Sequence, residues 1–211
     1  WSGVDVFEIM KDVTGHMNML VGMVEDPDWI KDMATTYSTL TVQLQEMLFA
    51  EEGWPDGIWF YEDMGFKGRP FMSPAMYREI IQPAHARTFS FAHSHNLPVI
   101  VHSCGMVASL VPGLMEAGMD CLQVIEVKAG MDLLQLYRDY GERLSFMGGI
   151  DVRVLYTNDP AQIDAELEAK IPTVKGRYGY VLHSDHSIPN TVHYSSYRHF
   201  VDRGLALGTY C

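Results

Sequence analysis

The chain has 211 residues, of which 47% are hydrophobic and 20% charged, a balance that suits one substantial core and excludes a disordered tail or a coiled coil. With 27 acidic and 15 basic residues, its formal net charge is −12, so we expect no nucleic-acid partner. The sequence has no apolar run of about 18 residues and no opening signal-peptide pattern, so we expect no membrane partner either. The three cysteines, Cys104, Cys121 and Cys211, suggest no disulfide framework and indicate a reducing, cytoplasmic setting.

The N-terminal part of the chain is predicted to be helical. We expect residues 1–56 to form a helical N-terminal segment of one single domain, and residues 57–211 to form the C-terminal βα units of the same domain. Asp26 and Pro27 are typical of an N-cap and a first helical position. Apolar residues then recur at helical spacing as far as Phe49, and Gly53 ends the pattern.

Short apolar strands alternate with helices in the rest of the chain. The five predicted strands cover residues 57–63, 97–104, 119–126, 144–151 and 178–185. The predicted helices cover residues 73–95 with a kink at Pro83, 106–118, 132–140, 159–171 and 194–207. Continuously apolar strands are typical of a parallel sheet buried on both faces. Either a doubly wound sheet or a TIM barrel fits, and the lack of a glycine-rich phosphate loop favours the barrel. A complete barrel would need eight strands.

The stretch VIVHSCGM, residues 99–106, places a histidine and a cysteine two residues apart at a strand end. Residues i and i+2 of a strand point to the same face, so His102 and Cys104 are predicted to project together. In a TIM barrel this end carries the active site, and a neutral imidazole with a thiolate is a natural ligand pair for zinc. The alternative is a buried thiol beside a hydrogen-bonded histidine.

The other predicted strands also end in groups that can bind a metal or move a proton. These groups are Glu62, Asp63, Glu126, Asp151, His183, Asp185 and His186. Their convergence predicts an active site at this end of the sheet. For Asp63 and Asp151, helix capping or hydrogen bonding at the rim is the alternative. We expect Cys121 to pack in the core, and His85, His93 and His95 to be surface or packing residues of a helix.

Three segments together resemble the uroporphyrinogen decarboxylase superfamily. They are RPFMSPAMYREIIQPAHARTFSFAHSHNLPVIVHSCGMVASLVPGLMEAGMDCLQVI, GERLSFMGGIDVRVL and HSDHSIP, which follow one another in the family's order. The resemblance implies a TIM (β/α)8 barrel of the uroporphyrinogen decarboxylase type. Because the chain begins at Trp1 and has five predicted strands, we expect it to be the C-terminal part of that barrel, with about five βα units.

The His-x-Cys pair resembles one branch of this superfamily, the cobalamin-dependent methyltransferases, such as methylcobalamin:coenzyme M methyltransferase. Members of this branch hold a catalytic zinc with such a pair and a cysteine further along the chain. The resemblance therefore implies zinc on His102 and Cys104, with His186 at the position of the later cysteine. It also implies a corrinoid carried by a partner protein, and a small acceptor or a methoxylated substrate. Asp63, Asp151 and His186 are the candidate catalytic residues, and a homo-oligomer stays open.

Two other functions compete with this interpretation. One is a metal-free uroporphyrinogen decarboxylase of porphyrin biosynthesis, in which Asp63 or His186 would steer protonation of a pyrrole-like ring. Acidic porphyrins would need basic groups near the site, and the sequence offers few of them. The other is a non-catalytic barrel fragment that binds a partner.

Overall fold

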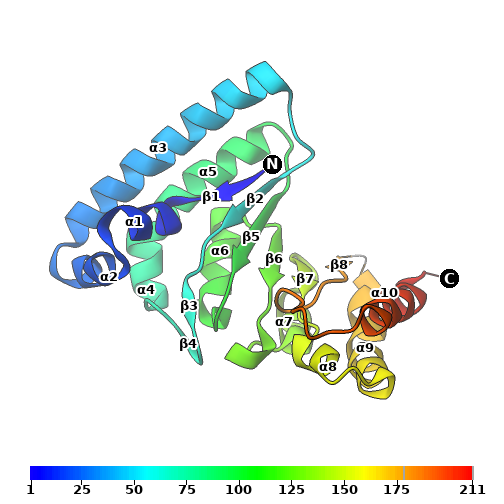
Figure 1. The fold of residues 1–211 in the computed structure, drawn as a ribbon. Coiled ribbons are helices and arrows are strands. Elements are labelled where there is room, and N and C mark those ends of the chain that lie inside the picture. Colours follow the sequence, from blue (N-terminus) through cyan, green and yellow to red (C-terminus); the bar gives the residue numbers. More distant parts are fainter. Residues whose placement is uncertain (178, 211) are drawn as a thin grey trace. The chain divides into compact units, whose positions relative to one another are not determined.

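The structure is a computed structural model that describes residues 1–177 and 179–210. The chain divides into two compact units, Trp1–Leu122 and Gln123–Cys211, and each is described by itself. Both have α/β architecture, in which helices follow parallel strands (Figure 1). The expectation that residues 1–56 and 57–211 belong to one single domain stays a prediction.

The first unit is built around parallel strands in the order β1-β2-β5-β6. Their bounds are Ser2–Val4 for β1, Ile58–Tyr61 for β2, Val99–Ser103 for β5 and Cys121–Val124 for β6, which crosses the border between the units. β1 pairs with β2, and β2 pairs with β5 in a register that sets Tyr61 beside His102. A two-stranded antiparallel hairpin, β3 (Gly65–Phe66) and β4 (Arg69–Pro70), follows β2. The register between β2 and β5 therefore brings two strand ends together.

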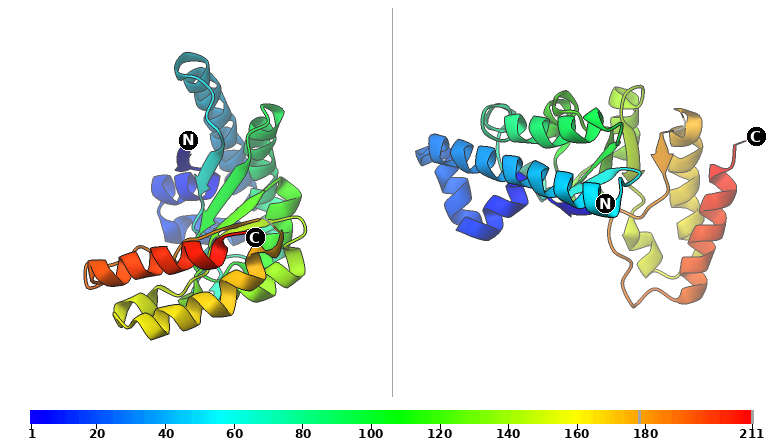
Figure 2. Two further views of the ribbon diagram at one scale, coloured as in Figure 1. Left: turned by 90° about the vertical axis from the view of Figure 1, so that its right-hand side faces the viewer. Right: turned by 90° about the horizontal axis from the view of Figure 1, so that it is seen from above.

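Helices pack around these strands. They are α1 (Val6–Thr14), α2 (His16–Glu25), α3 (Pro27–Glu52), α4 (Pro74–Met76), α5 (Gln82–Ser94), a 3-10 turn at Ala108–Leu110 and α6 (Val111–Ala117). The α3 helix begins as predicted, because Asp26 accepts a hydrogen bond from the Trp29 N–H and Pro27 occupies the first turn. It runs alongside α5 (Figures 1 and 2).

The kink predicted near Pro83 takes the form of a π-helical turn. This turn spans Tyr77–Ile81, between α4 and α5, and the Gln82 N–H donates to the Tyr77 carbonyl five residues back. Pro83 has no N–H to continue the regular α-helical ladder, and a wider turn before it accommodates that loss. The widened turn belongs to the segment that carries Tyr77 and His85 into the core.

The second unit continues from β6 through β7 (Ser145–Gly148) to β8 (Tyr180–Val181), and β7 and β8 are parallel. Its other elements are 3-10 turns at Val127–Ala129 and Lys175–Arg177, and the helices α7 (Leu133–Tyr140), α8 (Val152–Tyr156), α9 (Pro160–Val174) and α10 (Tyr194–Gly208). A buried cluster that includes Leu155, Leu167 and Phe200 joins α8, α9 and α10, and α9 and α10 lie side by side (Figure 2). As predicted, Asp132 and Asp159 cap α7 and α9.

The structure differs from the sequence-based expectation in three short elements. The strand β1, the β3–β4 hairpin and the helix α8 were not predicted, because each is too short to show a periodic apolar pattern. β8 is shorter than the predicted strand over residues 178–185. The parallel strands confirm the α/β class, but residues 1–177 and 179–210 form no closed barrel. None of the helices among them is long and apolar enough to cross a bilayer.

Candidate metal centre

His102 and Cys104 lie together at the end of β5, as the spacing predicts. Along this strand the valines and Ser103 are buried, whereas Ile100 and His102 face a half-buried side, and Cys104 continues that side. The Cys104 Sγ lies 3.4 Å from the His102 Nε2. The Tyr61 ring, from the neighbouring strand, lies 4.5 Å from the imidazole ring, centroid to centroid. The strand period and the β2–β5 register thus fix the direction in which the imidazole points.

Asp63 brings a carboxylate to the same place. Its Oδ1 lies 3.2 Å from the His102 Nε2 and accepts a hydrogen bond of 2.8 Å from the Cys104 N–H. Burial acts to raise the pKa of this carboxyl group, but the hydrogen bonds from His102 and Cys104 outweigh it and hold the pKa below its usual value. Asp63 is therefore an anion at neutral pH, which is the form that binds a metal.

Two glycines let the loops that carry these side chains meet. A Cβ placed on Gly105 would lie 2.2 Å from the Gly65 carbonyl carbon, and Gly105 has a φ of +83°. The Met106 N–H donates to the Phe66 carbonyl across the same contact, over 2.9 Å. Asp63 and Cys104 each lie one or two residues before these positions. Direct contact between the two backbones therefore sets the spacing of the donor groups.

The three side chains fit a zinc ion by the chemistry of their donors. One imidazole nitrogen, one thiol sulfur and one carboxylate oxygen all lie within 4.8 Å of one another. These are the three donor types that zinc binds in proteins, and a set of three protein ligands leaves a position open for a substrate. The predicted zinc ligands were His102, Cys104 and His186; the structure brings Asp63, a predicted catalytic residue, to the first two.

The remaining histidine of the predicted set belongs to the second unit. His186 is exposed in the loop after β8, and its carbonyl accepts a hydrogen bond from the Ser184 hydroxyl. His183 is half-buried in the same loop. The prediction that His186 binds the same metal as His102 and Cys104, and that it is catalytic, stays a prediction.

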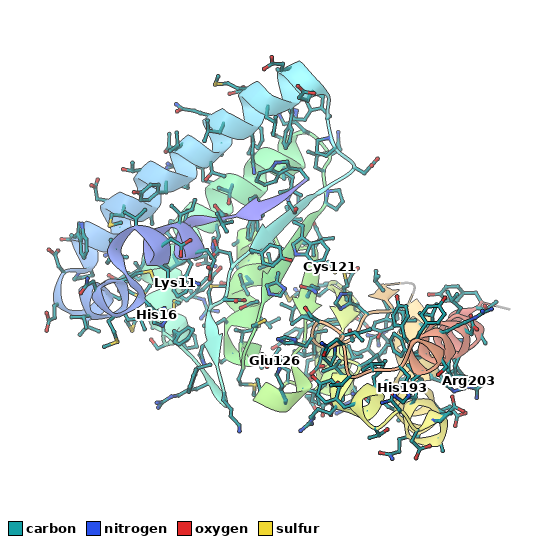
Figure 3. All side chains as sticks on the ribbon, in the orientation of Figure 1. Lys11, His16, Cys121, Glu126, His193 and Arg203 are labelled. Atoms are coloured by element: carbon teal, nitrogen blue, oxygen red, sulfur yellow. The ribbon has the colours of Figure 1, made fainter. Side chains whose placement is uncertain are left out.

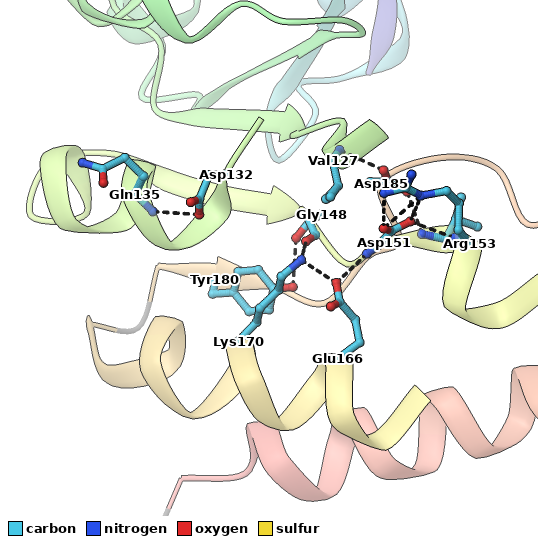
Figure 4. A network of polar contacts seen from close by, with 12 residues as sticks. Val127, Asp132, Gln135, Gly148, Asp151, Arg153, Glu166, Lys170, Tyr180 and Asp185 are labelled. Atoms are coloured by element: carbon cyan, nitrogen blue, oxygen red, sulfur yellow. Dashed lines mark hydrogen bonds and ion pairs between the residues drawn. The ribbon is translucent and has the colours of Figure 1, made fainter. Parts of the chain in front are cut away.

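The carboxylates at the strand ends of the second unit bind backbone groups and a cation (Figure 4). Asp151 caps α8 by accepting from the Arg153 N–H, and it also forms an ion pair with the Arg153 guanidinium. Asp185 is fully buried and accepts from the N–H groups of Val127 and Val152. Burial raises the pKa of Asp185 in spite of these hydrogen bonds. The capping alternative considered for Asp151 is therefore present in the structure, and a catalytic role for it stays a prediction.

Cys121 is not part of the metal centre. Cys121 (Figure 3) is buried in β6, as predicted, and burial raises the pKa of its thiol to about 12. Cys211 lies outside the described residues.

A second group, Asp5, Glu62 and His85, was missed by the sequence analysis. All three side chains are fully buried. His85 was expected to be a surface or packing residue. Its spacing of four from both Ile81 and Phe89, which are buried, was a signal for burial. Asp5 gave no such signal.

Comparisons with known proteins identify the family to which the chain belongs. The family model described as uroporphyrinogen decarboxylase (URO-D) matches residues 7–204. A curated protein of Methanosarcina mazei, a methylated-thiol–coenzyme M methyltransferase, is 31% identical over 93 residues, which make up 44% of this chain and 23% of that protein. A solved Xaa-Pro dipeptidase with methionine bound in its active site reaches a TM-score of 0.39 at 14% identity, over 73% of this chain and 40% of that one. This last likeness is too weak to support a conclusion.

Proposed function

Because the chain belongs to the uroporphyrinogen decarboxylase family, we propose that it is a zinc-dependent methyltransferase. It would move a methyl group between a corrinoid protein and a small acceptor or a methoxylated substrate. The observation that carries this proposal is the convergence of Asp63, His102 and Cys104 where the neighbouring strands β2 and β5 end. The similarity to a curated methyltransferase supports it, although the match covers 23% of that relative's length. We further propose that the α/β units belong to a (β/α)8 barrel and that the protein works in the cytoplasm.

Zinc, when bound, would supply a Lewis acid that lowers the pKa of an acceptor thiol. The chain's own residues do the rest of the work. His102 and Cys104 would bind the ion, and Asp63 would both bind it and hold the Cys104 backbone through the N–H bond. The Tyr61 ring limits how far the imidazole can turn. His186 is proposed as the further ligand, and Asp151 as a group at the rim of the site.

The test uses two cysteine variants of the same chain. In cobalt-loaded protein, a thiolate-to-Co(II) absorption band reports a metal on Cys104, and methyl transfer to a thiol acceptor reports activity. We expect Cys104→Ala to lose both the band and the activity, because a thiolate ligand has been removed. The matched control, Cys121→Ala, removes a buried thiol outside the site and should retain both.

A band that persists in Cys104→Ala would overturn the proposal. Wild-type protein that shows no band but releases carbon dioxide from a porphyrinogen would favour the metal-free decarboxylase. Folded protein with neither property would favour a fragment that binds a partner.

A further inference from the structure

Asp5, Glu62 and His85 form a compact donor set inside the first unit. Asp5 follows β1, Glu62 follows β2, and His85 lies on α5. One oxygen or nitrogen from each lies within 4.8 Å of the others, and the His85 Nε2 is 3.4 Å from the Glu62 Oε1. Each side chain is 0% exposed. The set is therefore separate from the half-buried Asp63, His102 and Cys104.

Each of the three side chains is oriented by a neighbour on its outer side. The Glu62 oxygens accept from the Phe7 and Glu8 N–H groups at the start of α1, each over 3.2 Å. The Thr88 hydroxyl donates to the Asp5 Oδ2 over 2.6 Å. The Tyr77 hydroxyl and the His85 Nδ1 are hydrogen-bonded over 3.0 Å. Such outer partners are typical of metal ligands, since they fix the ring or carboxylate in position.

The inner side of the set has polar atoms that lack partners. The Asp5 Oδ1 and the His85 Nε2 are buried and make no hydrogen bond. Buried polar atoms normally have a hydrogen-bond partner. Two such atoms without one, close to the Glu62 carboxylate, therefore indicate a site that a bound ion can fill. Lys11, the basic residue of α1 (Figure 3), forms an ion pair with Glu8. Within the described residues, no Lys or Arg forms an ion pair with Asp5 or Glu62.

We propose that Asp5, Glu62 and His85 bind one divalent first-row transition-metal ion, Mn²⁺, Fe²⁺ or Zn²⁺, in a structural role. Two carboxylate charges would be balanced by the dication, and both orphaned atoms would become ligands. The imidazole nitrogen favours these ions over Mg²⁺ and Ca²⁺, which prefer oxygen donors alone. Full burial leaves no path for a substrate, so the ion would join β1, β2 and α5 rather than take part in a reaction.

A shared proton is the competing explanation. One proton between Asp5 and Glu62 would leave one negative charge in the core, and the His85 Nε2, 3.4 Å from the Glu62 Oε1, would still make no hydrogen bond. A metal satisfies all three groups at once, and burial lowers the pKa of His85 to about 4, which keeps the imidazole in its neutral, metal-binding form. Glu62 and Asp63 are consecutive, so two metal sites would lie on opposite sides of one strand end.

The experiment isolates this site by removing the other one. The full chain carrying His102→Ala and Cys104→Ala is expressed with supplemented Mn²⁺, Fe²⁺ and Zn²⁺, and its bound metals are measured by plasma mass spectrometry. Unfolding and refolding with each ion in turn allows for slow entry into a buried site. We expect one equivalent of metal, and the cobalt form should lack the thiolate band. Metal-free, folded protein after both treatments would overturn the proposal.

Two variants in this background localise the metal. His85→Gln should abolish binding. If it does not fold, Thr88→Val serves instead, because it removes only the outer hydrogen bond of Asp5 and should weaken metal affinity by about 10–100-fold. Thr39→Val is the matched control and should leave affinity unchanged, because this exposed hydroxyl on α3 bonds Thr35 and Arg87 and none of the three ligands. Equal affinity in Thr88→Val and Thr39→Val would count against the site. Absence of metal from the His102→Ala, Cys104→Ala protein would contradict this proposal, whereas absence of the cobalt–thiolate band from wild-type protein would contradict the proposed function. The two proposals can therefore fail independently.

Discussion

The strand ends of the two units carry the same kind of residue in different company. In the first unit, Glu62 faces the His85 imidazole and Asp63 faces the His102 imidazole, and the His85 Nε2 makes no hydrogen bond. In the second unit, Asp151 and Asp185 face backbone N–H groups and the Arg153 guanidinium. A carboxylate at a strand end is therefore not a functional signal by itself. Its neighbours decide whether it is a ligand or a structural acceptor.

The largest effect on stability should come from a carboxylate that accepts buried backbone hydrogen bonds, and a smaller one from a candidate metal ligand. Asp185→Ala would leave the buried N–H groups of Val127 and Val152 without an acceptor, so it should lower the free energy of unfolding by about 2–4 kcal/mol. Asp63→Ala removes a side chain that is 42% exposed and should cost about 1 kcal/mol. Urea unfolding of the two variants checks both values. A greater loss from Asp63→Ala than from Asp185→Ala would break the comparison.

For zinc affinity, in contrast to stability, we expect the larger effect from the carboxylate of the first unit. Asp63→Asn keeps an oxygen for the Cys104 N–H but loses the charge, so affinity for zinc should fall at least about tenfold. Asp151→Asn, the matched change in the second unit, should leave zinc affinity unchanged, because Asp151 bonds the N–H and the guanidinium of Arg153. Competition with a chromogenic chelator measures both. A clear loss of affinity in Asp151→Asn would instead support its catalytic candidacy.

A smaller effect is expected from acid on the second unit. Burial opposes ionisation of Asp151, but the hydrogen bonds and charge of Arg153 prevail and lower the pKa of this carboxyl group. A lowered folded-state pKa stabilises the fold above the unfolded pKa of about 3.9, and the gain disappears as the pH falls through the folded value. The free energy of unfolding of wild type should therefore be higher than that of Asp151→Asn by about 1 kcal/mol at neutral pH. The difference is small because Arg153 is largely exposed.

The measurement is urea unfolding of wild type and Asp151→Asn at pH 7 and at successively lower pH. The difference should shrink below about pH 3.9. A difference that is constant with pH would mean that the charge of Asp151 contributes nothing.

The smallest expected effect is measured on the unsubstituted protein. The Cys121 thiol is buried and its pKa is raised to about 12, so iodoacetamide at neutral pH should leave it unmodified. Cys104 is half-buried and should be alkylated in metal-free protein but protected when zinc is present. Peptide mapping by mass spectrometry distinguishes the two sites. Equal alkylation of Cys104 with and without zinc would argue against its role as a ligand.

Local patterns were enough to predict much of the fold. Asp26, Asp132 and Asp159 were identified as helix starts from the residues that follow each of them, and the two-residue strand period put His102 and Cys104 on one side. The resemblance of three segments to the uroporphyrinogen decarboxylase superfamily is confirmed by the family match over residues 7–204.

What the sequence did not reveal depends on contacts between distant segments. Whether Asp63 meets His102 depends on the β2–β5 register, which no local pattern encodes. Asp5 is held by Thr88, 83 residues away, so its role in the core could not be predicted from its neighbours in the chain. Closure into a barrel is likewise a property of strand pairing, and the described residues form parallel strands without it.

The contact between Gly65 and Gly105 has a consequence for redesign. Because main chain touches main chain there, the anchor points of Asp63 and Cys104 are set independently of any rotamer. Asp63→Glu would lengthen the carboxylate side chain by one methylene while its Cα stays in place. Cys104→Asp would exchange a soft sulfur donor for a hard oxygen donor. Single substitutions at Asp63 or Cys104 should therefore change which metal ion the site prefers without moving the backbone, as long as Gly65 and Gly105 are kept.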